Sequence, residues 1–190
     1  DLLFFPTGGG KTEAYLGLVA ATFALRRRQR DLGGVDGGEG VAAVMRYTLR
    51  LLTAQQFERA AALVCATEVI RRDDEEQWGE VPFRMGLWVG QQLTPNRSED
   101  ARKAILDLRA RRSPRNSPVQ LSICPWCGTD IDPAASQGSV YQVQTHEENT
   151  KTERTIIFCA NTECEFAAQK APGEGIPVIS VDDEIYRFLP

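Results

Sequence analysis

Long hydrophobic runs and histidine are both scarce in this sequence of 190 residues. No apolar stretch approaches the roughly 18 residues that a membrane-spanning helix needs, so we expect no membrane partner. His146 is the single histidine, which leaves a Cys–His or Ser–His–Asp hydrolase little to work with. No secretory signal is recognisable, which favours a cytoplasmic location. Because the chain begins at Asp1 and lacks an initiator methionine, we expect a piece of a longer protein.

Charge is not strongly biased to either sign. The formal net charge is −4, which does not indicate a basic nucleic-acid-binding domain. This is weak evidence against such binding, because large motor proteins bind nucleic acid through local patches. Arginine runs at 26–30 and 109–115 are candidates for such patches or, alternatively, solvated helix ends.

Short apolar runs alternate with helical patterns. We expect strands over 2–5, 41–45 and 84–89, helices over 12–28 and 51–72, a mobile glycine-rich loop over 31–40, and a third helix with Ser98 as N-cap. A buried-strand pattern returns over 177–186. This alternation predicts an α/β fold, a parallel sheet with helices on both faces.

A change of composition divides the chain. Residues 113–118 hold two prolines and two serines and mark a linker. We expect residues 1–112 to form a partial α/β lobe, residues 119–170 to form a small β insertion, and residues 171–190 to return to the lobe.

A glycine triplet separates the first expected strand from the first expected helix. The residues expected to bind ATP are Thr7, Gly8, Gly9, Gly10, Lys11 and Thr12. Glycines let backbone N–H groups converge on a phosphate, and the helix directs its positive end to the same point. Lys11 would contact the β- and γ-phosphates and Thr12 would bind Mg²⁺, so these two are the candidate catalytic residues. The alternative is a glycine-rich turn that happens to precede Lys-Thr.

The general pattern G-x-x-x-x-G-K-[ST] is incomplete, because Phe5 occupies its first glycine position. Pro6–Thr12 is instead similar to the P-T-G-x-G-K-T form of superfamily 2 helicases and translocases. In that superfamily the next strand leads into a P-T-R-x-L-x-x-Q segment that contacts the nucleic-acid backbone.

A partial match to that second segment follows the strand expected over 41–45. Arg50, Leu52 and Gln55 fall in register, whereas Thr48 and Leu49 replace the Pro and Thr. A helix N-terminus with an arginine and hydroxyls suits a phosphodiester, so Thr48, Arg50 and Gln55 are the candidate nucleic-acid contacts. The alternative is an ordinary amphipathic helix start.

Several phrases together resemble the helicase subunit of DISARM-type bacterial antiphage systems. They are PTGGGKTEAYLGL, RYTLRLLTAQQFERA, GLWVG with TPN, and VDDEIYRFLP. The resemblance covers most of residues 1–112 and 176–190. It implies a RecA-like motor lobe of an ATP-driven DNA translocase that acts with partner proteins against foreign DNA.

Four of the five cysteines form two close pairs, Cys124 with Cys127 and Cys159 with Cys164. Paired cysteines in a reducing compartment indicate a metal site. A turn-like stretch flanked by strand-like segments separates the pairs, so we expect a zinc ribbon. Its four thiolates would leave no open position on Zn²⁺, which indicates a structural site. The alternatives are free cysteines, a disulfide or an iron–sulfur cluster.

Two other residues bear on this site. His146 lies in the expected hairpin turn, where it is either a solvated residue or a substitute for one thiolate. Cys65 lies among small apolar residues of a helix and is expected in the core.

Pro177–Glu184 resembles an apolar strand followed by the Asp-Glu pair of an ATPase, so that Asp183 and Glu184 would hold Mg²⁺ and orient the attacking water. In the family that the chain resembles, however, this phrase precedes the D-E-x-H box, which would lie beyond Pro190. We therefore expect this piece to bind nucleotide without hydrolysing it alone.

The sequence thus predicts part of an ATP-dependent DNA helicase or translocase with ATP, Mg²⁺ and Zn²⁺ as cofactors. Its expected partners are DNA, with RNA left open, and other subunits of a defence complex. One alternative is a non-catalytic zinc-bearing scaffold on a degenerate phosphate-loop domain. A phosphate-loop kinase is disfavoured by the segment Arg50–Gln55.

Overall fold

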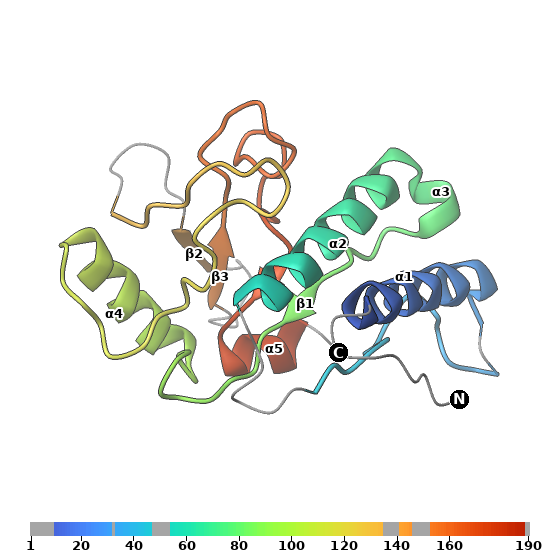
Figure 1. The fold of residues 1–190 in the computed structure, drawn as a ribbon, viewed down its shortest axis with the longest axis horizontal. Helices are drawn as coiled ribbons and strands as arrows, with labels where there is room; N and C mark the ends of the chain where they lie inside the picture. The colour runs from blue at the N-terminus through green and yellow to red at the C-terminus, as the bar shows by residue number, and fades with distance from the viewer. Residues whose placement is uncertain (1–9, 32, 47–53, 135–140, 146–152, 189–190) are drawn as a thin grey trace.

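The computed structural model describes residues 10–31, 33–46, 54–134, 141–145 and 153–188. Its elements, in chain order, are α1 (Lys11–Gln29), α2 (Ala54–Asp73), α3 (Glu75–Trp78), β1 (Met85–Gly86), α4 (Ser98–Arg109), β2 (Tyr141–Thr145), β3 (Glu153–Ile157), β4 (Val178–Ile179) and α5 (Asp182–Phe188). Figure 1 shows α4 and α1 at opposite ends of the long axis, with both sheets between them.

A two-stranded parallel sheet joins distant parts of the sequence. β1 pairs with β4, with Met85 opposite Val178 and Gly86 opposite Ile179. The N–H of Leu87 extends the pairing by donating to the carbonyl of Ile179 at 2.8 Å. Strands within 84–89 and 177–186 are therefore confirmed, although each is shorter than expected. The structure shows a mixed α/β arrangement with a small parallel sheet, and the RecA-like fold stays a prediction.

A separate antiparallel hairpin precedes the second cysteine pair. β2 and β3 pair in a register that runs from Tyr141 opposite Ile157 to Thr145 opposite Glu153. The turn that contains His146 lies outside the described residues. The N–H of Ile176 donates to the carbonyl of Ile157 at 2.7 Å, which ties the hairpin to the chain entering β4. Gly175 makes this approach possible, since a Cβ there would lie 2.3 Å from the same carbonyl.

The two long helices confirm the sequence prediction closely. α1 ends with Arg26, Arg27 and Arg28 in its last turn, where positive charge interacts favourably with the helix dipole. The loop that follows α1 is linked back to it, because the N–H of Gly37 donates to the carbonyl of Arg30 at 2.6 Å. α2 contributes Phe57 and other buried residues to the core. Within the described part of the chain, no helix is long and apolar enough to cross a membrane.

Ser98 is not the N-cap of the third expected helix. α4 begins at Ser98, and the extended Arg97 occupies the cap position. The Ser98 hydroxyl contacts carboxylates of Asp183 and Glu184, at 3.3 and 2.8 Å, so a tertiary contact takes the place of the local one. The expected buried face is present, because Ala101 and Ile105 are buried.

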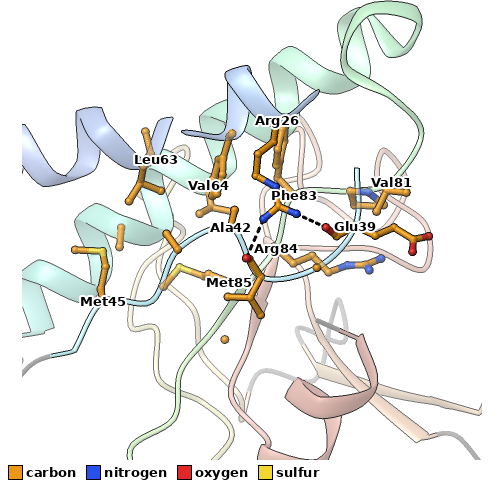
Figure 2. A pocket seen from close by; sticks show the side chains of 18 of the residues that line it. Arg26, Glu39, Ala42, Met45, Leu63, Val64, Val81, Phe83, Arg84 and Met85 are labelled. Carbon is orange, nitrogen blue, oxygen red and sulfur yellow. Dashed lines mark hydrogen bonds between the residues drawn. The ribbon is translucent and has the colours of Figure 1, made fainter. Parts of the chain in front are cut away.

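The strand expected over 41–45 is wrong, because residues 41–46 are irregular. Arg26 donates to the carbonyls of Val41 and Glu39 and thereby takes the place of a neighbouring strand as donor (Figure 2). Residues on this segment and on β1 both line a largely apolar cavity of about 430 Å³, with α1 and α2 as further walls. Val44 is 83% exposed, which is unlike a central strand.

One hydrophobic core connects the elements on either side of the expected linker at 113–118. Its members are Phe57, Ala61, Cys65, Leu87, Ile105, Leu121, Cys124, Ile131, Ile157, Cys159, Cys164, Phe166, Ile176 and Val178. Three of the four paired cysteines thus belong to the same cluster as α2. Cys65 lies in this core as expected. The division of the chain into domains stays a prediction.

Candidate metal centre

The structure brings the four paired cysteines together. Their sulfur atoms all lie within 4.8 Å of one another. The Sγ atoms of Cys124 and Cys164 are 3.8 Å apart, and those of Cys127 and Cys159 are 3.4 Å apart. Four sulfurs at about 2.3 Å from a tetrahedral Zn²⁺ would be separated by about 3.8 Å. The donor set and its spacing therefore fit a metal ion such as zinc.

The first pair sits on a tight turn that its local sequence explains. The N–H of Cys124 donates to the carbonyl of Thr129 at 2.7 Å, and the N–H of Gly128 donates back to the carbonyl of Cys124 at 2.9 Å. Gly128 has φ of 75°, a left-handed conformation that favours glycine. The turn thereby directs Cys124 and Cys127 toward one point.

The second pair uses a longer turn. The N–H of Cys159 donates to the carbonyl of Phe166 at 2.9 Å, and the N–H of Cys164 donates to that of Asn161 at 3.0 Å. The Asn161 side chain accepts from the N–H of Glu163 at 3.0 Å, which adds a further local hydrogen bond to the turn. The N–H of Phe166 contacts the sulfur of Cys164 at 3.5 Å, a contact that supports negative charge on that atom.

Burial makes the cluster dependent on a cation. Cys124, Cys159 and Cys164 are buried, whereas Cys127 is exposed. Burial raises the pKa of Cys159 to about 11 and raises that of Cys164 as well. Burial also acts to raise the pKa of Cys127, but hydrogen bonds from Thr129 and the neighbouring cysteines outweigh it and lower the pKa to about 6. A bound cation would supply the charge that keeps all four groups as thiolates.

Helix α2 holds the second cysteine turn through Arg72, a contact that sequence reasoning missed. The Arg72 guanidinium lies over the ring of Phe166, 5.0 Å from its centroid, and donates to the carbonyl of Glu165 at 3.2 Å. Trp126 packs edge-on against the same ring at 6.2 Å. Both turns therefore share one aromatic support. Spacing cannot reveal this contact, because Arg72 and Glu165 are 93 residues apart.

The candidate nucleotide and nucleic-acid residues are only partly described. Gly10 is left-handed, with φ of 77°, and precedes Lys11 and Thr12 in the first turn of α1. Gln55 lies in the first turn of α2, next to the expected nucleic-acid segment. The remaining candidates lie outside the described residues; they are Thr7, Gly8, Gly9, Thr48 and Arg50. The arrangement of these two candidate sites stays a prediction.

Of the three carboxylates after β4, Glu184 occupies an interior position, whereas Asp182 and Asp183 are partly exposed. Asp182 starts α5, and Glu184 is fully buried. Glu184 accepts hydrogen bonds from the N–H and hydroxyl of Thr155, at 2.9 and 3.0 Å, and from the hydroxyl of Ser98 at 2.8 Å. These contacts give Glu184 a structural role that links α5, β3 and α4.

Glu184 makes folding depend on pH in a defined direction. Burial raises its pKa, despite hydrogen bonds from Thr155 and Ser98 that lower it. The folded chain therefore holds this proton more tightly than the unfolded chain, whose glutamate pKa is about 4.3. This contribution to stability is present below that value and is lost as pH rises through the raised pKa.

We expect Glu184→Gln to flatten this part of the pH dependence. Melting temperatures of the variant and the wild type, measured from about pH 4.5 to 7.5, should diverge in favour of the variant as pH rises. Profiles that stay parallel, with a constant offset between the two melting temperatures, would reflect only the altered hydrogen bonds. That result would show that the pKa of Glu184 does not change on folding.

Comparison with known proteins identifies a relative from a DISARM system. No family model matches the chain. A DISARM protein DrmA from Bacillus paralicheniformis is 39% identical over 198 residues, a match that covers 100% of this chain. The chain is similar to DrmA throughout its length. It spans only 16% of the length of that curated relative.

The similarity to DrmA extends the resemblance seen in the sequence. Because the match covers all of this chain, it includes both the segment around Gly10–Thr12 and the cysteine-bearing segment. The resemblance to the DISARM subunit is confirmed at this level. Membership of superfamily 2 is a wider statement, and it stays a prediction because the match covers a small part of the DrmA protein.

Proposed function

We propose that this chain is part of an ATP-driven DNA helicase or translocase of superfamily 2 that works in DISARM antiphage defence. The observation that carries the proposal is the 39% identity to a DISARM protein DrmA along the whole chain. The phosphate-loop pattern and the segment before α2 supply the chemical part. The whole protein's partners would be DNA and other subunits of the defence complex.

In this proposal ATP binds at the N-terminus of α1. The left-handed Gly10 and the 19-residue helix behind it suit an anion site, since a long helix directs unpaired N–H groups at the phosphates. Lys11 would neutralise charge on the β- and γ-phosphates, and Thr12 would hold Mg²⁺. Thr7, Gly8 and Gly9 would complete the cradle.

Nucleic acid would contact the start of α2. Thr48 and Arg50 would bind phosphodiester oxygens, and Gln55 would add a polar contact from the first helical turn. Such contacts fix the position of a motor on its track without selecting a sequence. The same chemistry suits DNA and RNA, so the test below includes both.

Zinc would have a structural role. Four thiolates complete a tetrahedral shell and leave no position for water or substrate. Three of the four cysteines belong to the core that includes α2, so metal binding would stabilise the helix that begins at the nucleic-acid segment. Cys124, Cys127, Cys159 and Cys164 would be the ligands.

ATP hydrolysis by the full-length protein tests the proposal. We expect hydrolysis to rise with single- or double-stranded DNA and to fall at least about a hundredfold in Lys11→Ala, because that variant loses phosphate-charge stabilisation. Lys103→Ala, on the exposed face of α4 with the Lys103 side chain 65% exposed, is the matched control and should keep the wild-type rate. If RNA stimulates hydrolysis and DNA does not, the nucleic-acid substrate would be RNA and the proposed ATP-driven translocation would stand.

A zinc-bearing scaffold is the second candidate, and the cysteine cluster favours it independently of ATP. A scaffold would retain its metal and its partner subunits but show no nucleotide hydrolysis under any of these conditions. In that case the glycine-rich turn would have no catalytic role, and Lys11→Ala would change nothing.

A further inference from the structure

Two large aromatic rings form an exposed pair that the proposed sites do not use. The rings of Trp88 and Tyr186 lie 5.3 Å apart at an interplanar angle of 75°. The two residues are 62% and 67% exposed. A single exposed aromatic side chain is ordinary, but two in contact present one continuous apolar surface. Edge-to-face packing also leaves ring faces open to solvent.

The pair lies at the carboxyl edge of the parallel sheet. Trp88 follows Leu87, whose N–H donates to the carbonyl of Ile179 on β4. Tyr186 lies on α5, which begins shortly after β4 and sits beside the end of β1 (Figure 1). Ligands of open parallel sheets bind outside the carboxyl ends of the strands. Both rings therefore lie at the edge of the sheet where a ligand is expected to bind.

The backbone under the pair is fixed by hydrogen bonds. The N–H of Asp182 donates to the carbonyl of Pro95 at 3.1 Å, and the N–H of Asp183 donates to that of Asn96 at 3.0 Å. The buried Glu184 pins the same helical turn from inside. A ligand that contacts Tyr186 would therefore not have to order α5, which reduces the entropic cost of binding.

The carboxylates beside the rings are either paired with a cation or buried. The carboxylate of Asp183 pairs with Arg187 at 3.3 Å, and Glu184 is fully buried. Ring surface is therefore the main feature offered to a ligand at this place. Any unpaired base can stack on an aromatic side chain, because every base has a flat π-face, and the stacking itself requires no charge on the protein.

We propose that Trp88 and Tyr186 form a stacking platform for unpaired bases of single-stranded DNA. The inference rests on the proposed function, because it assigns a binding place to the bases of the DNA that the motor would move. Phosphates would be bound elsewhere, by the segment before α2. The pair would thus favour single strands over duplex, whose bases are not available for stacking on side chains.

The test uses the full-length protein and two oligonucleotides of equal length, oligo(dT) and an abasic strand with the same phosphates. We expect Trp88→Ala to weaken oligo(dT) binding roughly tenfold and to leave abasic and duplex binding unchanged. Trp88→Phe should retain affinity within about threefold, because it keeps a ring. Tyr186→Ala should act in the same direction. The slope of affinity against salt concentration should not change, since no phosphate contact is removed.

Leu106→Ala removes another exposed apolar side chain, on α4, and is the matched control. Equal weakening on both strands, or no weakening in Trp88→Ala and Tyr186→Ala while the wild type binds DNA, would overturn the platform and leave the motor proposal intact. Absence of any DNA binding by the wild type would overturn both. If the Trp88 and Tyr186 variants lose binding to another subunit but keep their affinity for DNA, the two rings would form a protein contact instead.

Discussion

Cys124→Ser should abolish stoichiometric metal binding and lower the melting temperature of the chain by about 10 °C or more. Loss of a structural metal belongs to the few changes that cost more than about 4 kcal/mol of unfolding free energy. For a domain of this size each kcal/mol corresponds to about 2–4 °C. Cys124 is 1% exposed and belongs to the main core, so its loss would be felt beyond the cysteine turns. Metal analysis and thermal unfolding measure the two effects.

Cys65→Ala is the matched control, because Cys65 is also buried in the core but is not one of the four clustered cysteines. It should keep one metal ion per chain and cost only about 1–2 kcal/mol. Treating the wild type with a chelator should reproduce the Cys124→Ser melting curve. Less than about one metal per wild-type chain would contradict the site, and visible iron–sulfur absorption would replace zinc by a cluster.

Local patterns in the sequence predicted the cluster of four cysteines well. Each cysteine turn closes through hydrogen bonds within a few residues, such as the one from Gly128 back to Cys124. The bounds of α1 and α2 could also be predicted, because a run of good helix formers and a basic last turn are local properties. A single sequence therefore predicts those features that are determined by residues close together in the chain.

Features set by distant partners could not be predicted in this way. The segment 41–45 has strand composition, but its first carbonyl, that of Val41, accepts from the Arg26 side chain instead of from a neighbouring strand. Ser98 has a helix-capping side chain, but Glu184 engages it from 86 residues away. The support of the second cysteine turn by Arg72 is of the same kind. Each outcome depends on which elements meet in space.

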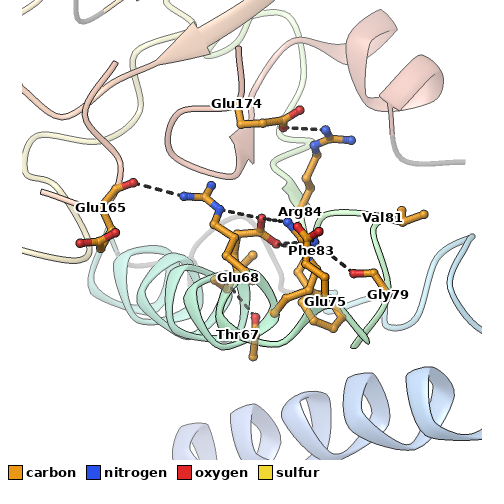
Figure 3. Close-up of polar contacts among 12 residues, drawn as sticks. Thr67, Glu68, Glu75, Gly79, Val81, Phe83, Arg84, Glu165 and Glu174 are labelled. Atoms are coloured by element: carbon orange, nitrogen blue, oxygen red, sulfur yellow. Dashed lines mark hydrogen bonds and ion pairs between the residues drawn. The ribbon is translucent and has the colours of Figure 1, made fainter. Parts of the chain in front are cut away.

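Glu68 shows how much a missed tertiary contact can matter. It lies 1% exposed in α2 and pairs with Arg71, itself 5% exposed, through two contacts of 2.9 Å (Figure 3). The same carboxylate accepts from Arg72 at 3.0 Å and from the N–H of Phe83, just before β1, at 2.8 Å. One buried charge therefore connects α2, the entry to the parallel sheet and the residue that supports the cysteine turn.

Glu68→Ala should destabilise the chain by about 3–5 kcal/mol, because it leaves the Arg71 guanidinium buried without its main partner. The N–H of Phe83 also loses its acceptor. Denaturant unfolding of the metal-loaded chain measures the change, and metal analysis should still find the ion in the folded fraction.

Glu75→Ala provides the matched control, since Glu75 pairs with the same Arg71 at 2.9 Å but is 53% exposed. Its loss should cost no more than about 1 kcal/mol, because water replaces an exposed partner. The contrast compares a buried with an exposed carboxylate on the same Arg71, and Glu68→Ala also removes the acceptor of Arg72 and of the Phe83 N–H. Equal effects of the two substitutions would show that the Glu68 pair is solvated and that the connection from α2 to the cysteine turn is weak. A loss confined to Glu68→Ala would identify this buried pair as a support of α2 and of the chain that enters the parallel sheet.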